Sequence, residues 1–302
     1  MYAVSAKNIE KSYGAEKALR GVSFDVPRGE MFGLIGPDGA GKTSLFRILT
    51  TLLLADSGSA TVDGYDVVKD YAEIRSRVGY MPGRFSLYQD LSVEENLNFF
   101  ATLFNTTVKE NYHLIKDIYQ HIEPFSTRKA GALSGGMKQK LALSCALIHK
   151  PSVLFLDEPT TGIDPVSRKE FWEMLKRLKE QNITIIVSTP YMDEAVICDR
   201  IALISEGKFM QIETPQNIIK DFSKKLFAVA GDNMSILLNG IRELEIVESA
   251  FAFGDEHHVT LKDSVHNHTD IELELLNKGY SNVHVKEIQA GIEDCYMNLS
   301  KN

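Results

Sequence analysis

The sequence of 302 residues lacks most of the features that mark a secreted or a membrane-spanning chain. Its three cysteines, Cys145, Cys198 and Cys295, are far apart and form no C-x-x-C pair, so neither a disulfide nor a cysteine metal site is expected. No run approaches the ~20 apolar residues that a membrane-crossing helix needs. The first residues lack the apolar stretch of a secretory signal. We therefore expect a cytoplasmic protein whose thiols stay reduced.

Basic residues are outnumbered by acidic ones. There are 33 Lys and Arg against 41 Asp and Glu, which gives a formal net charge of −8. Domains that bind nucleic acid usually carry a basic patch, so nucleic acid is not an expected partner. The remaining composition, 44% hydrophobic and 25% charged, is ordinary for a globular chain. The length fits one large domain, or one domain with a small appendage.

Short apolar runs separated by helical patterns predict a mainly parallel α/β sheet in the first part of the chain. The strand candidates there are residues 31–35, 153–156 and 183–187. Residues 22–26 and 59–63 look like strands joined by short turns, which predicts an antiparallel element. Residues 88–150 are mostly helical in pattern and predict a helical subdomain inserted into the α/β core.

The composition shifts near Asp221, and a second, smaller domain is predicted beyond it. Its element order is βαββαβ followed by a helix, which is a small α+β domain. We therefore expect domains at 1–221 and 222–302. The predicted strands of the second domain cover 226–230, 244–253, 257–262 and 282–285, and its helices cover 234–242, 270–278 and 292–299.

One segment has the spacing of a phosphate-binding loop, G-x-x-x-x-G-K-[ST], between a strand and a helix. Its glycines permit a tight turn whose N–H groups point at phosphate oxygens, and the helix N-terminus adds positive potential. Lys42 can place its charge on the β- and γ-phosphates, and Thr43 can give its hydroxyl oxygen to Mg²⁺. The expected nucleotide-binding residues of this segment are Gly36, Pro37, Asp38, Gly39, Ala40, Gly41, Lys42, Thr43 and Ser44.

Two acids follow the apolar strand at 153–156. Asp157 is expected in the Mg²⁺ shell, and Glu158 is expected to polarise the water that attacks the γ-phosphate. Alone, such a pair is weak evidence, because a strand often ends in acids to meet solvent. Together with the upstream phosphate loop it indicates phosphoryl transfer. Between the two motifs, LSGGMKQ at 133–139 predicts a helix start with Ser134 as its cap.

The order of these motifs resembles that of the ATP-binding cassette (ABC) family. The phosphate loop, LSGGMKQ and LFLDEPTTGIDP at 154–165 carry the resemblance, which covers residues 1 to about 220. It implies a P-loop NTPase fold, with ATP and Mg²⁺ as cofactors. It also implies a second cassette as partner, with two ATP molecules sandwiched head to tail between the two cassettes.

The resemblance also implies roles for single residues of this chain. Ser134, Gly135 and Gly136 would serve the nucleotide of the partner cassette. Tyr13 matches the aromatic that stacks on adenine in the family, although an ordinary turn aromatic is the alternative. Asp164 matches the loop that crosses the dimer interface.

Weaker matches resemble cassettes of drug- and lipid-export systems of the ABC-2 type, namely the segments 190–195 (PYMDEA) and 285–296. They imply an ATP-hydrolysing motor of an exporter, held at the inner face of the cell membrane by a membrane subunit on another chain. In the family, the loop with Phe85, Leu87 and Tyr88 docks that subunit, and core packing is the alternative. An ATP-binding regulatory subunit without turnover and a soluble non-transport cassette ATPase are the other candidate functions.

Two positions depart from the family pattern. Gly83 stands where the family usually has a glutamine that contacts Mg²⁺ and the attacking water. Pro190 stands where it usually has a histidine that contacts the γ-phosphate. No histidine occurs between His149 and His257, so none nearby replaces it.

The expected consequence is a site that binds ATP but turns over slowly, since losing one positioned polar group costs ~10²–10³ in rate. The intact LSGG motif would still complete a site on a different cassette, which favours an asymmetric heterodimer. A homodimer with slow turnover is the alternative, because the phosphate loop and both acids remain. Pro190 itself is expected in the first turn of a helix capped by Thr189 or Ser188.

Four histidines near the C-terminus invite comparison with a Zn²⁺ site: His257, His258, His266 and His268. No carboxylate or cysteine completes an obvious ligand set. A His-rich surface turn is therefore the favoured interpretation.

Overall fold

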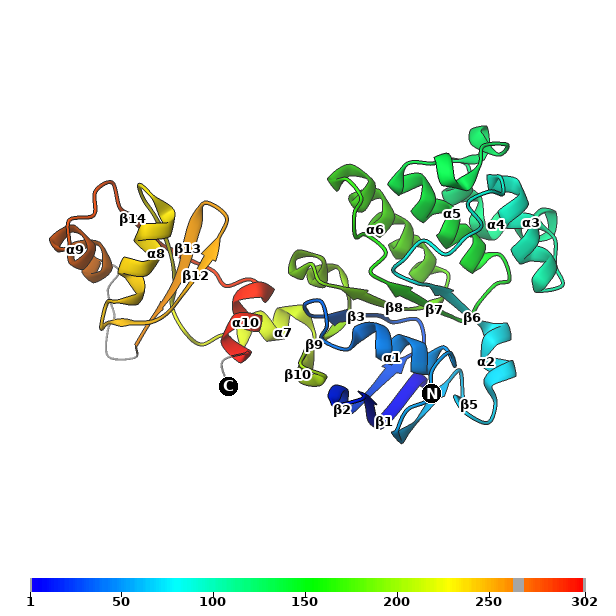
Figure 1. The fold of residues 1–302 in the computed structure, drawn as a ribbon, viewed down its shortest axis with the longest axis horizontal. Coiled ribbons are helices and arrows are strands. Elements are labelled where there is room, and N and C mark those ends of the chain that lie inside the picture. Colours follow the sequence, from blue (N-terminus) through cyan, green and yellow to red (C-terminus); the bar gives the residue numbers. More distant parts are fainter. Residues whose placement is uncertain (1, 263–268, 301–302) are drawn as a thin grey trace. The chain divides into compact units, whose positions relative to one another are not determined.

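The computed structural model describes residues 2–262 and 269–300 of the chain (Figure 1). Contacts divide the chain into two units, Met1–Pro215 and Gln216–Asn302. The division places helix α7 (Pro215–Lys220) almost entirely in the second unit, whereas the sequence places the boundary just after that helix.

A six-stranded sheet with the order β10-β9-β3-β8-β7-β6 forms the centre of the first unit. Five of its strands are parallel, and only β10 pairs antiparallel, with β9. Strands β3, β7 and β8 are buried along their whole length, which explains their uninterrupted apolar sequences. The predicted parallel sheet is thus confirmed. The strands are β3 (Met31–Ile35), β6 (Val78–Met81), β7 (Val153–Asp157), β8 (Thr184–Thr189), β9 (Arg200–Ser205) and β10 (Lys208–Glu213).

The predicted antiparallel element is a four-stranded sheet with the order β2-β1-β4-β5. Of its two central strands, β4 matches a predicted strand and β1 was not predicted. Several register shifts interrupt its pairing with β2, so the chain there lacks the alternation of apolar and polar residues that identifies a strand. The strands are β1 (Tyr2–Tyr13), β2 (Glu16–Pro27), β4 (Ser57–Val62) and β5 (Tyr65–Asp66).

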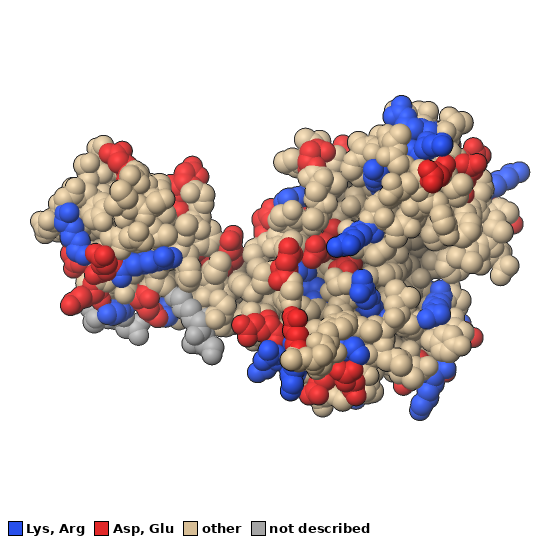
Figure 2. Space-filling view, viewed as in Figure 1, with Lys and Arg blue, Asp and Glu red and all other residues tan. Residues whose placement is uncertain are grey.

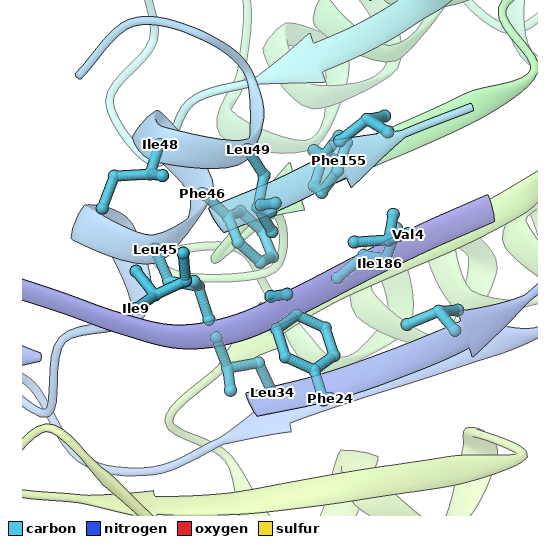
Figure 3. Close-up of a cluster of buried hydrophobic side chains, with 14 of the residues drawn as sticks. Val4, Ile9, Phe24, Leu34, Leu45, Phe46, Ile48, Leu49, Phe155 and Ile186 are labelled. Carbon is cyan, nitrogen blue, oxygen red and sulfur yellow. The ribbon is translucent and has the colours of Figure 1, made fainter. Parts of the chain in front are cut away.

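Helix α1 (Lys42–Leu49) belongs to the apolar core that joins the two sheets (Figure 3). Phe46 packs edge-on against Phe155 of β7, with ring centroids 5.5 Å apart. Phe24 of β2 stacks on Phe32 of β3 at the same distance, 5.5 Å. Each fully buried aromatic of this kind contributes about 1.5–3 kcal/mol by removal from water. The core therefore fixes α1, and with it the loop that precedes the helix.

Helices α3, α4 and α5 lie side by side in the predicted helical interval, between β6 and β7 (Figure 1). Capping boxes begin two of them, Ser92 with Glu95 for α3 and Thr107 with Glu110 for α4. Besides α1, the helices of the first unit are α2 (Tyr71–Arg77), α3 (Val93–Leu103), α4 (Val108–Tyr119), α5 (Gly135–Leu147) and α6 (Pro165–Glu180), with short 3₁₀ turns η1 (Glu123–Phe125), η2 (Ala130–Ala132) and η3 (Met192–Ile197).

After α7, the second unit has the predicted βαββαβ order followed by a helix. Its antiparallel sheet has the order β12-β13-β11-β14. Phe227 and Val229 of β11 pack with Leu237 of α8 and Leu275 of α9 in a core of its own. The elements are β11 (Leu226–Ala230), α8 (Met234–Arg242), β12 (Val247–Phe253), β13 (Glu256–Leu261), α9 (Thr269–Asn277), β14 (His284–Ile288) and α10 (Ile292–Leu299).

The structure assigns packing partners to the two described histidines of this unit. His257 Nε2 lies 2.7 Å from the Met234 carbonyl oxygen, and His258 Nδ1 lies 2.7 Å from Asp294 Oδ1. His266 and His268 lie outside the described residues. Within the described ranges, no group of three or more His, Cys, Asp or Glu side chains is placed to hold a metal ion.

The three cysteines are buried free thiols. Burial raises the pKa of Cys295 to about 11, so its thiol stays protonated and unreactive at neutral pH. In the part of the chain that the structure describes, no helix is both long and apolar enough to cross a membrane.

Candidate nucleotide site

The phosphate loop connects β3 to α1 in a conformation that only glycine permits at two points. A Cβ on Gly36 would lie 2.2 Å from the Ile204 carbonyl oxygen. Gly41 caps α1 with a φ of 104°, and a Cβ there would lie 2.3 Å from the Ala18 carbonyl oxygen. No side chain caps the first N–H groups of α1, which leaves them for an anion.

Lys42 is folded back into the loop. Its Nζ donates to the carbonyl oxygens of Gly36 at 2.8 Å and Pro37 at 2.9 Å, and it lies 3.2 Å from Glu158 Oε1. The side chain is only 3% exposed. A buried ammonium needs such partners, and phosphate oxygens could replace the Glu158 carboxylate among them.

The two acids at the end of β7 have different surroundings. Asp157 is 2% exposed, and its Oδ1 accepts a hydrogen bond from Ser188 Oγ at 2.6 Å. Glu158 has a left-handed φ of 50°, which is uncommon for a residue with a side chain and often found at functional sites. Its backbone N–H donates to Ser188 O at 3.0 Å and to Ser188 Oγ at 3.1 Å. Ser188 thus holds both acids in place.

A pocket of about 300 Å³ brings together several of the predicted nucleotide-binding residues. Tyr13 is 47% exposed at its rim, and its hydroxyl lies 3.3 Å from Ser44 Oγ, so the ring is tied to the start of α1. Lys11 Nζ lies over one face of the ring, 5.9 Å from its centroid, so a base would stack on the other face. The pocket is lined by Tyr13, Glu16, Ala18, Gly39, Gly41, Lys42, Thr43, Ser44 and Glu158.

The side-chain oxygens around this pocket are suitable ligands for the Mg²⁺ that accompanies a nucleotide. Mg²⁺ takes oxygen ligands and usually keeps phosphate oxygens and waters in its octahedral shell. Thr43 offers a hydroxyl oxygen in the pocket wall, and Asp157 keeps Oδ2 while Ser188 occupies Oδ1. Two protein oxygens are enough when a triphosphate supplies others.

Ser134, Gly135, Gly136 and Asp164 do not line this pocket. Ser134 caps α5 as predicted, with its Oγ accepting from Met137 N at 3.4 Å. Asp164 caps α6 by accepting from Ser167 N at 2.9 Å. These two helix starts contact each other, since a Cβ on Gly136 would lie 2.7 Å from Ser167 Oγ.

Gly83 lies against the acid pair, where the family pattern has glutamine. A Cβ at this position would be 3.1 Å from the Asp157 carbonyl oxygen and 3.8 Å from Glu158 Cβ. The contact is tight, so a side chain at 83 requires a shift of a few tenths of an ångström. Glycine leaves this edge of the site without a polar side chain.

The predicted helix start at Pro190 is wrong. Ser188 and Thr189 belong to β8, and η3 begins only at Met192, with Tyr191 before it and no side-chain cap. Both hydroxyls are used elsewhere, because Ser188 donates to Asp157 and Thr189 donates to buried Glu194 at 2.5 Å. The Thr189 hydroxyl also accepts from Tyr191 N at 3.1 Å, yet no helix begins at Pro190.

Sequence reasoning missed Ser188, Thr189 and Glu194 as members of the site. The first two end an apolar strand that runs parallel to β7, so their position beside the acids follows from sheet register. Glu194 lies in the segment PYMDEA, which the sequence identified only by its resemblance. An acid among apolar residues in that segment was the available signal.

A parallel sheet with a phosphate loop after β3 and an acid pair after β7 defines a P-loop nucleotide-binding domain. The family model described as ABC transporter matches residues 19–161. The chain belongs to this family.

Relatives and solved structures support the assignment. The probable multidrug ABC transporter ATP-binding protein YbhF of Escherichia coli (strain K12) is 36% identical over 307 residues, 98% of this chain and 52% of that protein. The linearmycin resistance ATP-binding protein LnrL of Bacillus subtilis (strain 168) is 35% identical over 248 residues, 81% of this chain and 78% of that protein. A dimeric ATP-binding cassette in a post-hydrolysis state with ADP and Pi has a TM-score of 0.64 and 25% identity, covering 70% of this chain and 98% of that chain. The chain thus spans about half the length of YbhF, 52%.

Proposed function

We propose that this chain is the ATP-driven motor of an exporter whose membrane-spanning part is a separate protein. The observation that carries the proposal is the pocket that joins Tyr13, the phosphate loop, Lys42 and Glu158. Relatives named for multidrug transport and linearmycin resistance favour export. ATP hydrolysis is the general activity of the family, and Mg²⁺ is the proposed metal. The proposed location is the inner face of the membrane.

In this proposal, ATP binding rearranges Lys42. The loop N–H groups and the N-terminus of α1 bind the phosphates. Lys42 exchanges its 3.2 Å contact with Glu158 for the β- and γ-phosphates. Glu158 is then free to orient and polarise a water, while Ser188 keeps Asp157 oriented. Mg²⁺, when bound, neutralises charge on the phosphates.

The proposed docking site for the membrane subunit is an apolar cavity of about 710 Å³ in the first unit. Leu87, Phe100 and Leu103 are among its lining residues. Beside it, Tyr88 is 52% exposed and packs edge-on against Phe99 at 4.9 Å, which leaves large apolar side chains at the surface. Such surfaces are typical of protein interfaces. Leu87 is itself buried, so of the predicted residues Tyr88 is the exposed contact.

Gly83 and Pro190 favour a second candidate function, that of an ATP-binding subunit without efficient turnover. Neither residue offers a polar side chain to the γ-phosphate or the attacking water. The chain would then bind ATP without efficient turnover and complete the active site of a different cassette through Ser134, Gly135 and Gly136. Figure 2 gives no support to a nucleic-acid function, since Lys and Arg are interspersed with Asp and Glu on the face drawn there.

Steady-state ATP hydrolysis of the purified chain, measured against its own concentration, tests the proposal. Glu158→Gln is the control, because it removes the base and keeps the size of the side chain. Activity that rises with concentration and vanishes in the variant supports a self-sufficient homodimeric motor. Mg-ATP binding without activity above the variant selects the asymmetric partner. A chain that does not bind Mg-ATP contradicts both.

A further inference from the structure

A buried carboxylate outside the phosphate pocket joins segments that are far apart in the sequence. Glu194 in η3 is 2% exposed. Its Oε1 accepts a hydrogen bond from Thr160 Oγ1 at 2.7 Å, and its Oε2 accepts one from Thr189 Oγ1 at 2.5 Å. Thr160 follows the acid pair after β7, and Thr189 ends β8. Since a buried carboxylate is stable only with its partners, the three residues form one unit.

Thr189 connects this unit to the phosphate loop. Its hydroxyl accepts from Tyr191 N at 3.1 Å while it donates to Glu194. Its backbone carbonyl accepts from the N–H of Gly36, the first residue of the loop, at 3.3 Å. The carbonyl of Gly36 in turn accepts from Lys42 Nζ at 2.8 Å. Two successive hydrogen bonds therefore lead from Lys42 to Thr189.

Arg168 connects the unit to the start of α6. Its Nε lies 3.6 Å from Glu194 Oε1, an ion-pair distance rather than a hydrogen bond. Its backbone N–H donates to the carbonyl of Asp164 at 2.9 Å. Gly136 packs against the same first turn, through Ser167. Glu194 thus lies between the phosphate loop and the Asp164 loop, which the family resemblance assigns to the dimer interface.

We propose that Glu194 is a positioning residue that transmits the nucleotide state of the phosphate loop to residues 160–168 and the start of α5. The inference rests on the proposed ATP-binding function. Pro190 has no polar side chain, so it provides no hydrogen-bonded route from the nucleotide. The route runs through the neighbouring residue, Thr189, whose hydroxyl is fixed by Glu194.

Amide hydrogen exchange of the full chain, with and without Mg-ATP, tests this role without needing turnover. In the wild type, Mg-ATP should slow exchange in peptides covering 36–43, by direct contact, and in peptides covering 160–168. We expect slowing of about fivefold or more at both. In Glu194→Ala, the slowing at 36–43 should persist and that at 160–168 should fall below about twofold.

Two control variants make the result specific. Glu194→Gln keeps the size of the side chain and can still bond both threonine hydroxyls, so it should retain most of the slowing at 160–168. Asp193→Asn alters the neighbouring acid, which is exposed and contacts the same arginine at 3.4 Å, and it should behave like the wild type.

The outcomes separate the inference from the proposed function. Equal slowing at 160–168 in wild type and Glu194→Ala overturns the positioning role. Loss of slowing at both 36–43 and 160–168 in that variant also overturns it, because Glu194 would then serve only to keep the fold. If the wild-type chain shows no slowing at 36–43, the ATP-binding function itself fails, and this inference fails with it.

Discussion

Lys42 and Glu158 form an ion pair, 3.2 Å apart, within the pocket where the triphosphate is proposed to bind. The base proposed for hydrolysis is thus paired with the cation proposed to hold the phosphates. Nucleotide binding has to break this contact, which couples occupancy of the loop to release of Glu158. A buried charge left without its partner is costly, so each residue depends on the other before ATP arrives.

The first prediction concerns Lys42→Met, which keeps the length of the side chain and removes its charge. Mg-ATP affinity should fall about 100-fold or more, because the contact with the β- and γ-phosphates is lost. Isothermal titration of the chain with Mg-ATP measures it. Lys176→Met, at a half-exposed lysine paired with Glu173 on α6, is the control and should bind as the wild type does. Equal affinity of both variants would contradict the proposed phosphate contact.

The second prediction concerns Ser188, whose hydroxyl donates to Asp157 at 2.6 Å. Ser188→Ala should raise the Mg²⁺ concentration needed for tight ATP binding by about tenfold, because Asp157 loses its orientation. A Mg²⁺ titration at fixed ATP gives the value. Ser144→Ala removes another buried hydroxyl, which bonds the Lys140 carbonyl in α5, and should cost only about 1 kcal/mol of stability. The idea is wrong if the two variants need the same Mg²⁺ concentration.

Elements with a regular hydrophobic period could be predicted from the sequence, and so could motifs with fixed spacing. The limits of β11, α8 and α10 follow from residue type, because each has an uninterrupted apolar face or run. The phosphate loop and acid pair follow from the demands of phosphate chemistry. The proximity of these two motifs follows from parallel sheet topology, in which strand ends meet at one edge.

The hydrogen bonds that hold the site residues in place could not be predicted, because they join strands and turns that are distant in the sequence. Glu194 bonds Thr160, which is 34 positions away in the chain. No local pattern specifies that pairing. The same reason explains the wrong expectation for Pro190. The sequence suggested a helix capped by Ser188 or Thr189, whereas β8 continues through both residues and their hydroxyls donate to Asp157 and Glu194.

The third prediction restores the family pattern at the two departing positions. Pro190→His combined with Gly83→Gln should raise ATP turnover by about 10- to 100-fold if the site is otherwise complete. The crowding of a Cβ at 83 against the Asp157 carbonyl, 3.1 Å away, limits the gain from glutamine, so Pro190→His alone should give most of it. The background rate is that of the triple variant, in which Glu158→Gln is added to Gly83→Gln and Pro190→His. An unchanged rate would mean that other features of the site, and not these two residues, limit hydrolysis.

The fourth prediction links stability to pH through His149, which lines the 710 Å³ cavity. Its ring stacks on Phe104 at 3.8 Å, and its Nε2 lies 3.2 Å from the Val78 carbonyl. Among the described residues its buried Nδ1 has no hydrogen-bond partner, so the neutral ring is favoured. Burial lowers the pKa of His149 from 6.5 to about 4. The folded state therefore resists protonation that the unfolded chain accepts.

The sign of the effect follows from linkage. Between pH 6.5 and 4 the unfolded chain binds the proton and the folded chain does not, so the free energy of unfolding falls as the pH is lowered. The full loss amounts to about 3 kcal/mol at most. In urea denaturation across this window, His149→Gln should lose that part of the pH dependence, since its amide can still donate to Val78 and does not titrate. His113→Gln, at an exposed histidine of α4, should keep the wild-type dependence. Identical pH profiles for the wild type and His149→Gln would show that His149 is not the group responsible.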